Sequence, residues 1–183
     1  MSVIDVLKYG DPRLRRVAKP VEDFSVLPDI IANMYDSMYE EEGIGLAANQ
    51  IGIDLNVFII DITHKEDVDE PIEFVNAKII DSSGETTFSE GCLSVPGIEF
   101  DIERPENITL QYQTLDGTTH KKEFNDLFAR AIQHEIDHLS GKLIVDHVSS
   151  ITKLRYKSKL KEIKELASHQ YFDLLQQDSA TLT

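Results

Sequence analysis

Apolar residues recur along the chain with two spacings, and each spacing predicts a type of element. In 25–42, side chains such as Ile30, Met34 and Met38 fall on one face of a helix, which predicts an amphipathic helix. A second helix is expected over about 126–140, because a glycine follows where helices commonly end. A third, basic helix is expected over 151–175, with the last residues frayed.

Runs rich in β-branched and aromatic residues predict strands at 56–61, 72–81, 98–104, 107–115 and 118–124. The Asp-Gly pair between the last two is typical of a tight hairpin turn. Strands precede the second helix with little strand–helix alternation, so we expect an α+β fold. In it, antiparallel or mixed sheets pack around a central helix. At 183 residues and 41% hydrophobic content, the chain is expected to form a single domain, 1–183, whose core spans about 5–150.

Composition narrows the setting in which the protein works. The net charge of −15 argues against sequence-specific or broad nucleic-acid binding. We expect no membrane span, because the sequence has no long apolar run, and no secretory signal at its start. The single cysteine precludes an intrachain disulfide and fits a reducing compartment, so we expect a cytoplasmic protein.

Segment 134–138 reads His-Glu-x-x-His inside the second predicted helix. Residues four apart on a helix share a face, so the imidazoles of His134 and His138 can reach one metal ion. The carboxylate of Glu135 can then act as general base on a metal-bound water. The alternative is a solvated helix face that carries two histidines by chance. The motif therefore predicts a metal site and leaves its third ligand open.

The third ligand separates the classes of protein that share this motif. Metzincin proteases have a histidine where this chain has Ile144, which cannot bind a metal. A thermolysin-like protease takes a glutamate from a later helix. The candidates there, Glu162 and Glu165, lie in a basic segment that we expect to be exposed. The remaining donor is Cys92, the only cysteine.

Cys92 also admits the ordinary interpretation that a reduced cysteine packs as a small hydrophobic residue. Its setting favours a ligand, because Gly91 precedes it and permits close approach of a bound molecule. One thiolate and two neutral imidazoles leave one tetrahedral position open for water, as in catalytic rather than structural zinc sites. The sequence holds no second thiol to close the site.

A third segment, 43–52, combines glycines, small residues and an amide. It lacks the lysine and the glycine spacing of phosphate-binding loops, so we discount nucleotide binding. Its small residues are also compatible with ordinary tight packing between a helix end and a strand. Beside the other two segments, the amide of Gln50 is the kind of donor that amide hydrolysis needs at a developing oxyanion.

Together, three segments resemble the signature motifs of the peptide deformylase family, in the family's order. They are Gly-Ile-Gly-Leu-Ala-Ala-Asn-Gln at 43–50, Glu-Gly-Cys-Leu-Ser at 90–94 and Gln-His-Glu-Ile-Asp-His-Leu at 133–139. The resemblance covers roughly residues 5–155. It implies a hydrolase that removes the N-formyl group from the formyl-methionine of newly made polypeptides and releases formate. The sequence departs from the family pattern at Ala77, where proline is common, and at Asp126, often a glycine.

The resemblance also implies how the metal is held and used. Cys92, His134 and His138 would bind it, with a water in the fourth position. Family members usually carry Fe(II), although zinc, nickel or cobalt can occupy the site. Glu135 would take a proton from the metal-bound water, which attacks the formyl carbonyl, and later deliver a proton to the departing amine.

The remaining roles implied by the resemblance concern the substrate. The side-chain amide of Gln50 and the backbone N–H of Leu93 would stabilise the tetrahedral oxyanion. The backbone at Gly45 and Gly91 would pair with the substrate as an added strand. Ile44 would help to shape the pocket for the methionine side chain.

Basic residues crowd near the C-terminus, at Lys153, Arg155, Lys157, Lys159, Lys161 and Lys164. One interpretation is a solvated helix with its apolar face packed inward. The other, suggested by bacterial relatives with similar tails, is a dock on the ribosome near the exit tunnel. Three further hypotheses stay open: a metalloprotease that cuts internal peptide bonds, a non-catalytic ribosome-binding paralogue, and a structural zinc protein.

Overall fold

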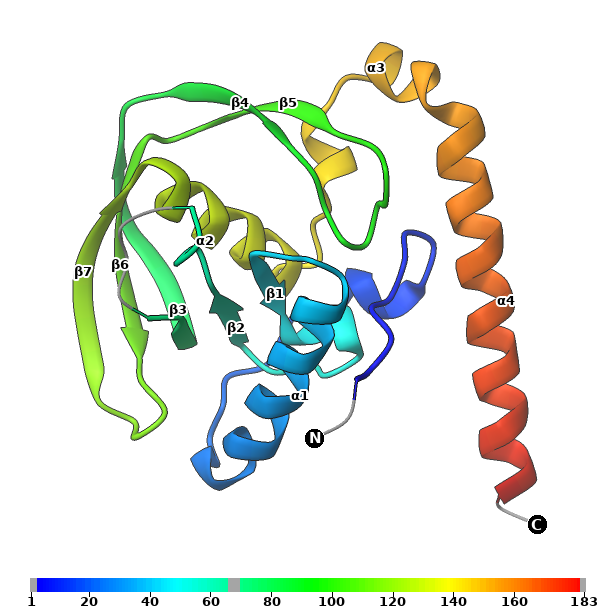
Figure 1. Ribbon diagram of the computed structural model, residues 1–183, viewed down its shortest axis with the longest axis horizontal. Helices are drawn as coiled ribbons and strands as arrows, with labels where there is room; N and C mark the ends of the chain where they lie inside the picture. Colours follow the sequence, from blue (N-terminus) through cyan, green and yellow to red (C-terminus); the bar gives the residue numbers. More distant parts are fainter. Residues whose placement is uncertain (1–2, 66–69, 182–183) are drawn as a thin grey trace.

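The computed structural model describes residues 3–65 and 70–181 (Figure 1). The strands are β1 (Gly45–Ala47), β2 (Val57–Ile60), β3 (Ile72–Ser83), β4 (Thr86–Glu90), β5 (Phe100–Arg104), β6 (Asn107–Gln113) and β7 (Thr119–Asn125). The helices are α1 (Leu27–Glu40), α2 (Asp126–Leu139), α3 (Ser150–Arg155) and α4 (Lys157–Thr181). Short 3₁₀ turns are η1 (Pro12–Arg15), η2 (Phe24–Val26), η3 (Ala48–Ile51) and η4 (Ile144–His147).

The strands form two antiparallel sheets around α2, which confirms the predicted α+β fold. Five strands pair in the order β1-β2-β3-β6-β7, and β4 pairs with β5 in a separate hairpin. Figure 1 shows α2 between the curved five-stranded sheet and the β4–β5 hairpin, with α1 near β1 and β2. Strand β1 lies at the edge of the larger sheet, so one side of its backbone is not paired within that sheet.

Strands β2 and β3 separate two apolar clusters of the core, one on each face of the sheet. Phe58 and Phe74 pack with residues of α2, whereas Val57 and Ile59 pack with residues of α1. This division follows from the strand period, because successive side chains point to opposite faces. All four residues of β2 are buried, which explains why its sequence is continuously apolar instead of alternating.

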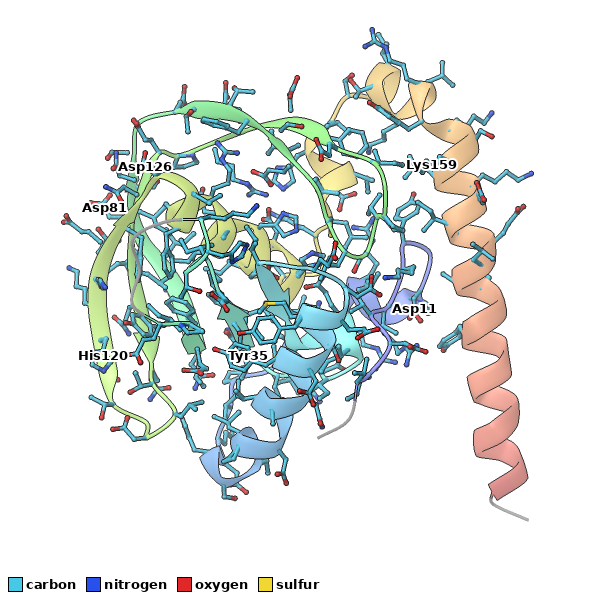
Figure 2. All side chains as sticks on the ribbon, viewed as in Figure 1. Asp11, Tyr35, Asp81, His120, Asp126 and Lys159 are labelled. Atoms are coloured by element: carbon cyan, nitrogen blue, oxygen red, sulfur yellow. The ribbon has the colours of Figure 1, made fainter. Side chains whose placement is uncertain are left out.

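Helix α2 begins and ends at residues with left-handed backbone conformations. Asp126, labelled in Figure 2, has φ 50°, a conformation that aspartate tolerates better than most residues. After the helix, Gly141 has φ 72°, and a Cβ there would lie 2.6 Å from the carbonyl oxygen of Arg15. The predicted glycine stop of this helix is therefore confirmed.

The C-terminal segment differs from the prediction in two ways. It forms two helices, with Tyr156 between α3 and α4, and α4 continues to Thr181 instead of ending at about 175. The helix is longer than the expected range because no glycine or proline interrupts the segment after Lys157, and the frayed end stays a prediction. Residues 182–183 of the expected tail lie outside the described part of the chain.

Helix α4 packs on the body of the protein through its first half. Leu160 and Ile163 are buried with Val95 and Ile98, which lie in the loop after β4. At the same place Lys159, labelled in Figure 2, donates from its Nζ to the carbonyl oxygen of Gly97 at 2.7 Å. Among the described residues, no helix is both long and apolar enough to cross a membrane.

Candidate active site

The structure brings the three predicted metal ligands together. His134 and His138 lie one turn apart on α2, with ring centroids separated by 5.0 Å, and Cys92 faces them from the loop after β4. The Cys92 Sγ is 3.2 Å from the Nε2 of His138, and one donor atom from each residue lies within 4.8 Å of the others. This spacing allows all three to contact a single ion.

The electrostatics of this cluster also fit a transition metal. Burial raises the pKa of the Cys92 thiol, but the charges of His138 and His134 outweigh burial and hold that pKa well below its usual value. Thiolate is the form of cysteine that binds metals. A thiolate beside two imidazoles is a donor set that suits zinc or iron, and it does not choose between them.

Glu135 places a carboxylate beside this cluster, in a buried position. Its side chain is 4% exposed, and its Oε2 has no hydrogen-bond partner among the residues that the structure describes. A Cβ on Gly45 would lie 2.5 Å from the Oε1 of Glu135, so only glycine leaves room for the carboxylate there. Burial raises the pKa of Glu135, which brings it closer to the range of an effective general base.

Gln50 is held in one orientation by two hydrogen bonds. Its Oε1 accepts from the backbone N–H of Ala47 at 2.8 Å, and its Nε2 donates to the Oγ of Ser94 at 3.2 Å. The residue is 2% exposed and lies in η3, directly after β1. Leu93 lies next to Cys92, and its carbonyl oxygen accepts from the Nζ of Lys8 at 3.0 Å. Gln50, Leu93 and Cys92 line the same cavity.

A cavity of about 570 Å³ opens onto these groups. Ile44, Gly45 and Gly91, the residues expected to contact substrate, all line it. The cavity is also lined by Gln50, Cys92, Leu93, His134 and Glu135. Its size is that of a site for a small ligand or a few residues of an extended peptide. One cavity therefore joins all of the predicted site residues except His138, which is buried behind it with 1% exposure.

Sequence reasoning missed a buried network of charges behind the cluster. Glu90 faces the Nδ1 of His134 at 3.2 Å and accepts from the Nε of Arg104 at 2.7 Å and the Nη1 of Arg130 at 2.5 Å. Burial raises the pKa of Glu90, but the hydrogen bonds from His134 and Arg104 outweigh it and lower the pKa to about 2. Such a carboxylate orients a ligating imidazole. The sequence signal for this network was Arg130, an arginine on the apolar side of α2.

The network continues from Arg104 to the other end of α2. The Nη1 of Arg104 donates to the Oδ2 of Asp137 at 2.8 Å, and the same oxygen lies 2.7 Å from the Nε2 of His147. Asp137 lies between Glu135 and His138 in the sequence, on the side of α2 away from the cavity. Asp137, inside the His-Glu-x-x-His segment, is thus held by ion pairs on the side away from the cavity.

The fold and the site together define a class of protein. It is the class of metal-dependent hydrolases in which one helix carries two histidines and an adjacent glutamate. The family model described as polypeptide deformylase matches residues 3–154. This chain belongs to the polypeptide deformylase family. The match confirms the resemblance inferred from the three motifs.

Individual proteins agree with the family match. The peptide deformylase of Hydrogenovibrio crunogenus is 43% identical over 168 residues, which cover 91% of this chain and 97% of that protein. A crystal structure of a peptide deformylase from Legionella pneumophila matches with a TM-score of 0.83 and 40% identity, over 91% of this chain and 98% of that one. The peptide deformylase structure from Thermus thermophilus matches with a TM-score of 0.84 and 35% identity, over 90% and 99% of the two chains.

Proposed function

We propose that this protein hydrolyses the N-formyl group of formyl-methionine at the start of newly made polypeptides and releases formate. The observation that carries the proposal is the convergence of Cys92, His134 and His138 next to the buried carboxylate of Glu135, in one open cavity. Membership of the family supports the same reaction. The enzyme would work in the cytoplasm, where the Cys92 thiol stays reduced.

In this proposal Cys92, His134 and His138 hold the metal ion. When bound, the ion lowers the pKa of a water molecule and polarises the formyl carbonyl. We propose Fe(II) as the native ion on the strength of the family resemblance, with zinc, nickel or cobalt as substitutes. Metal analysis of protein purified without oxygen tests this choice, and zinc as the dominant ion would overturn it.

Glu135 moves the protons of the reaction. Its carboxylate accepts a proton from the attacking water, and the same group then delivers a proton to the nitrogen of the departing amine. Burial raises the pKa of Glu135, which favours acceptance of the proton from water, and the protonated carboxyl then holds the proton that the amine takes.

Gln50 and Leu93 stabilise the negative oxygen that develops on the formyl carbon. The Nε2 of Gln50 is directed by the bond that its Oε1 accepts from Ala47, so the amide is oriented before substrate arrives. The backbone N–H of Leu93 is the second donor. The substrate chain extends along Gly45 and Gly91, and the edge position of β1 leaves backbone groups there for pairing with a peptide. Ile44 contacts the methionine side chain.

The direct test is formate release from a formyl-methionyl peptide by protein purified without oxygen. We expect rapid release from this peptide and none from the matched acetyl-methionyl peptide, because the acetyl methyl group does not fit where the formyl hydrogen lies. Fully metallated protein that releases no formate would overturn the proposal and favour a non-catalytic, ribosome-binding protein. Cleavage of internal peptide bonds would favour the metalloprotease alternative.

Replacing Gln50 with alanine tests the oxyanion donor. We expect kcat to fall by about 10²–10³-fold, because one preorganised donor is lost from the transition state. The measurement is steady-state formate release by metal-loaded protein. Since Gln50 also bonds Ala47 and Ser94, thermal unfolding and metal content are measured on the same sample. A loss of less than threefold with unchanged metal content contradicts the role.

We also propose that the basic residues of α3 and α4 dock the enzyme on the ribosome near the exit tunnel. Lys153, Lys157 and Lys161 line one open groove together with Tyr9 and Leu160, and Leu154 in the same groove is 66% exposed. Leu160 and Ile163 are buried against the body of the protein, so α4 can pack there while its basic residues stay accessible to a partner. Positive charge of this kind suits an RNA-rich surface.

Charge reversal of Lys153, Lys157 and Lys161 to glutamate tests the dock. We expect co-sedimentation with ribosomes to weaken steeply with added salt in the wild type and to be largely lost in the variant. The control reverses Lys121 and Lys122, which lie on β7 at the far edge of the sheet. Co-sedimentation that is equal in all three proteins contradicts the proposal.

A further inference from the structure

Asn49 connects the turn that carries Gln50 to the helix that carries the histidines. It lies in η3, is fully buried, and donates from its Nδ2 to the backbone carbonyl oxygen of His138. The orientation of the amide is settled by chemistry, because a carbonyl oxygen can only accept a hydrogen bond. The two residues are far apart in sequence, so the bond fixes η3 against the end of α2.

The neighbouring residue fixes the opposite side of the same turn. Gln50 bonds the Oγ of Ser94, two residues after Cys92 in the loop that follows β4. Consecutive side chains of η3 thus contact the two elements that carry the predicted metal ligands, Asn49 on α2 and Gln50 on the cysteine loop. Any rotation of η3 would move the Gln50 amide relative to His138.

The bond from Asn49 is not required to satisfy the end of α2. The carbonyl oxygen of His138 already accepts from the backbone N–H of Gly141 at 2.9 Å. The side chain of Asn49 also lowers the stability of the fold, because its buried Oδ1 has no hydrogen-bond partner within the described residues. For stability alone, an apolar side chain of similar size would serve at least as well. The amide at this position therefore points to a role other than stability.

We propose that Asn49 is a positioning residue that holds the oxyanion donor Gln50 at a fixed place relative to His138. The proposal rests on the proposed function, in which Gln50 stabilises the oxyanion. A displacement of about 1 Å in such a site can cost about 10²-fold in rate. Asn49 touches neither substrate nor ion, so it acts through Gln50 and through the backbone at His138.

A double-mutant cycle on the intact, metal-loaded enzyme tests this role. Asn49→Leu keeps the branched shape of the side chain and removes its polar atoms, and Asn49→Ala serves as a second variant should the larger leucine disturb packing. We expect either change to lower kcat by about 10–100-fold with little change in KM. In the Gln50→Ala background the same change should lower kcat by less than about threefold, because the donor that Asn49 positions is already gone.

Two further readouts separate positioning from a merely structural role. Release of the bound metal to a chelator should be faster in the Asn49 variants, since the backbone at His138 is less restrained, and unchanged in Gln50→Ala. Thermal unfolding of Asn49→Leu should occur at or above the wild-type temperature. Asn56→Ala is the matched control, because Asn56 accepts from the N–H of Ala77 away from the cavity and should show no coupling to Gln50.

Equal fold losses in the wild-type and Gln50→Ala backgrounds would overturn the inference, as would metal release at the wild-type rate. Failure of the proposed function looks different. In that case the wild-type protein releases no formate at all, whereas the chelator experiment still reports whether Asn49 restrains the end of α2.

Discussion

Replacement of Glu135 by alanine is expected to reduce kcat for a formyl-methionyl peptide by about 10³–10⁴-fold, with KM nearly unchanged. The carboxylate is buried beside the metal ligands, and no other carboxylate among the described residues is as close to Gly45 at the floor of the cavity. General acid–base groups typically contribute about 10²–10⁴-fold, and Glu135 serves in two proton transfers. Steady-state formate release measures the effect.

Glu135→Gln is the matched control, because it keeps the volume of the side chain and removes its ability to accept a proton. The glutamine variant should be about as inactive as the alanine variant. Both must bind metal as the wild type does, since Glu135 is not among the predicted ligands. If glutamine restored more than a tenth of the wild-type kcat, Glu135 would act through packing and not through proton transfer.

Replacement of Glu90 by glutamine is expected to lower the free energy of unfolding by about 3–5 kcal/mol, because removing one partner of a buried ion pair leaves uncompensated charge in a region of low polarity. Glu90 is 7% exposed and pairs with both Arg104 and Arg130, which are themselves buried. Urea unfolding followed by circular dichroism measures the loss, with equal denaturant slopes required for the comparison.

Glu99→Gln supplies the control for that experiment. Glu99 is an exposed carboxylate at the same cavity, where its Oε2 accepts from the Oγ of Ser89 at 3.0 Å. Its replacement should change the free energy of unfolding by less than about 0.5 kcal/mol. If Glu90→Gln were equally mild, the buried network would not stabilise the fold, and its role would be limited to orienting His134.

Patterns of neighbouring residues predicted those elements that depend mainly on interactions between residues close in the sequence. The apolar spacing in α1, the glycine after α2 and the Asp-Gly turn between β6 and β7 all correspond to observed structure. Helix α4 is longer than its local pattern predicted. Its length depends on uninterrupted helix-forming residues and on the packing of Leu160 and Ile163 against the body of the protein.

The roles assigned to individual site residues, and the single-domain organisation, stay predictions. The donor set, the general base and the oxyanion amide could be proposed from residue types and spacing alone, because metal and amide chemistry restrict the side chains that can serve. The charged network could not be proposed in this way. Arg130 on the apolar side of α2 indicated a buried partner, but its partners Glu90, Ile102 and Thr86 belong to β4 and β5, which only the fold places beside α2.

Residue types and local spacing were enough to identify the family and the class of fold and to predict the chemistry at three short segments. How those segments meet was visible only once the chain was folded. The fold placed Cys92 against two histidines, put Glu135 beside Gly45, and buried Glu90 between two arginines. Contacts between residues far apart in sequence depend on how sheets and helices pack, and no local pattern carries that information.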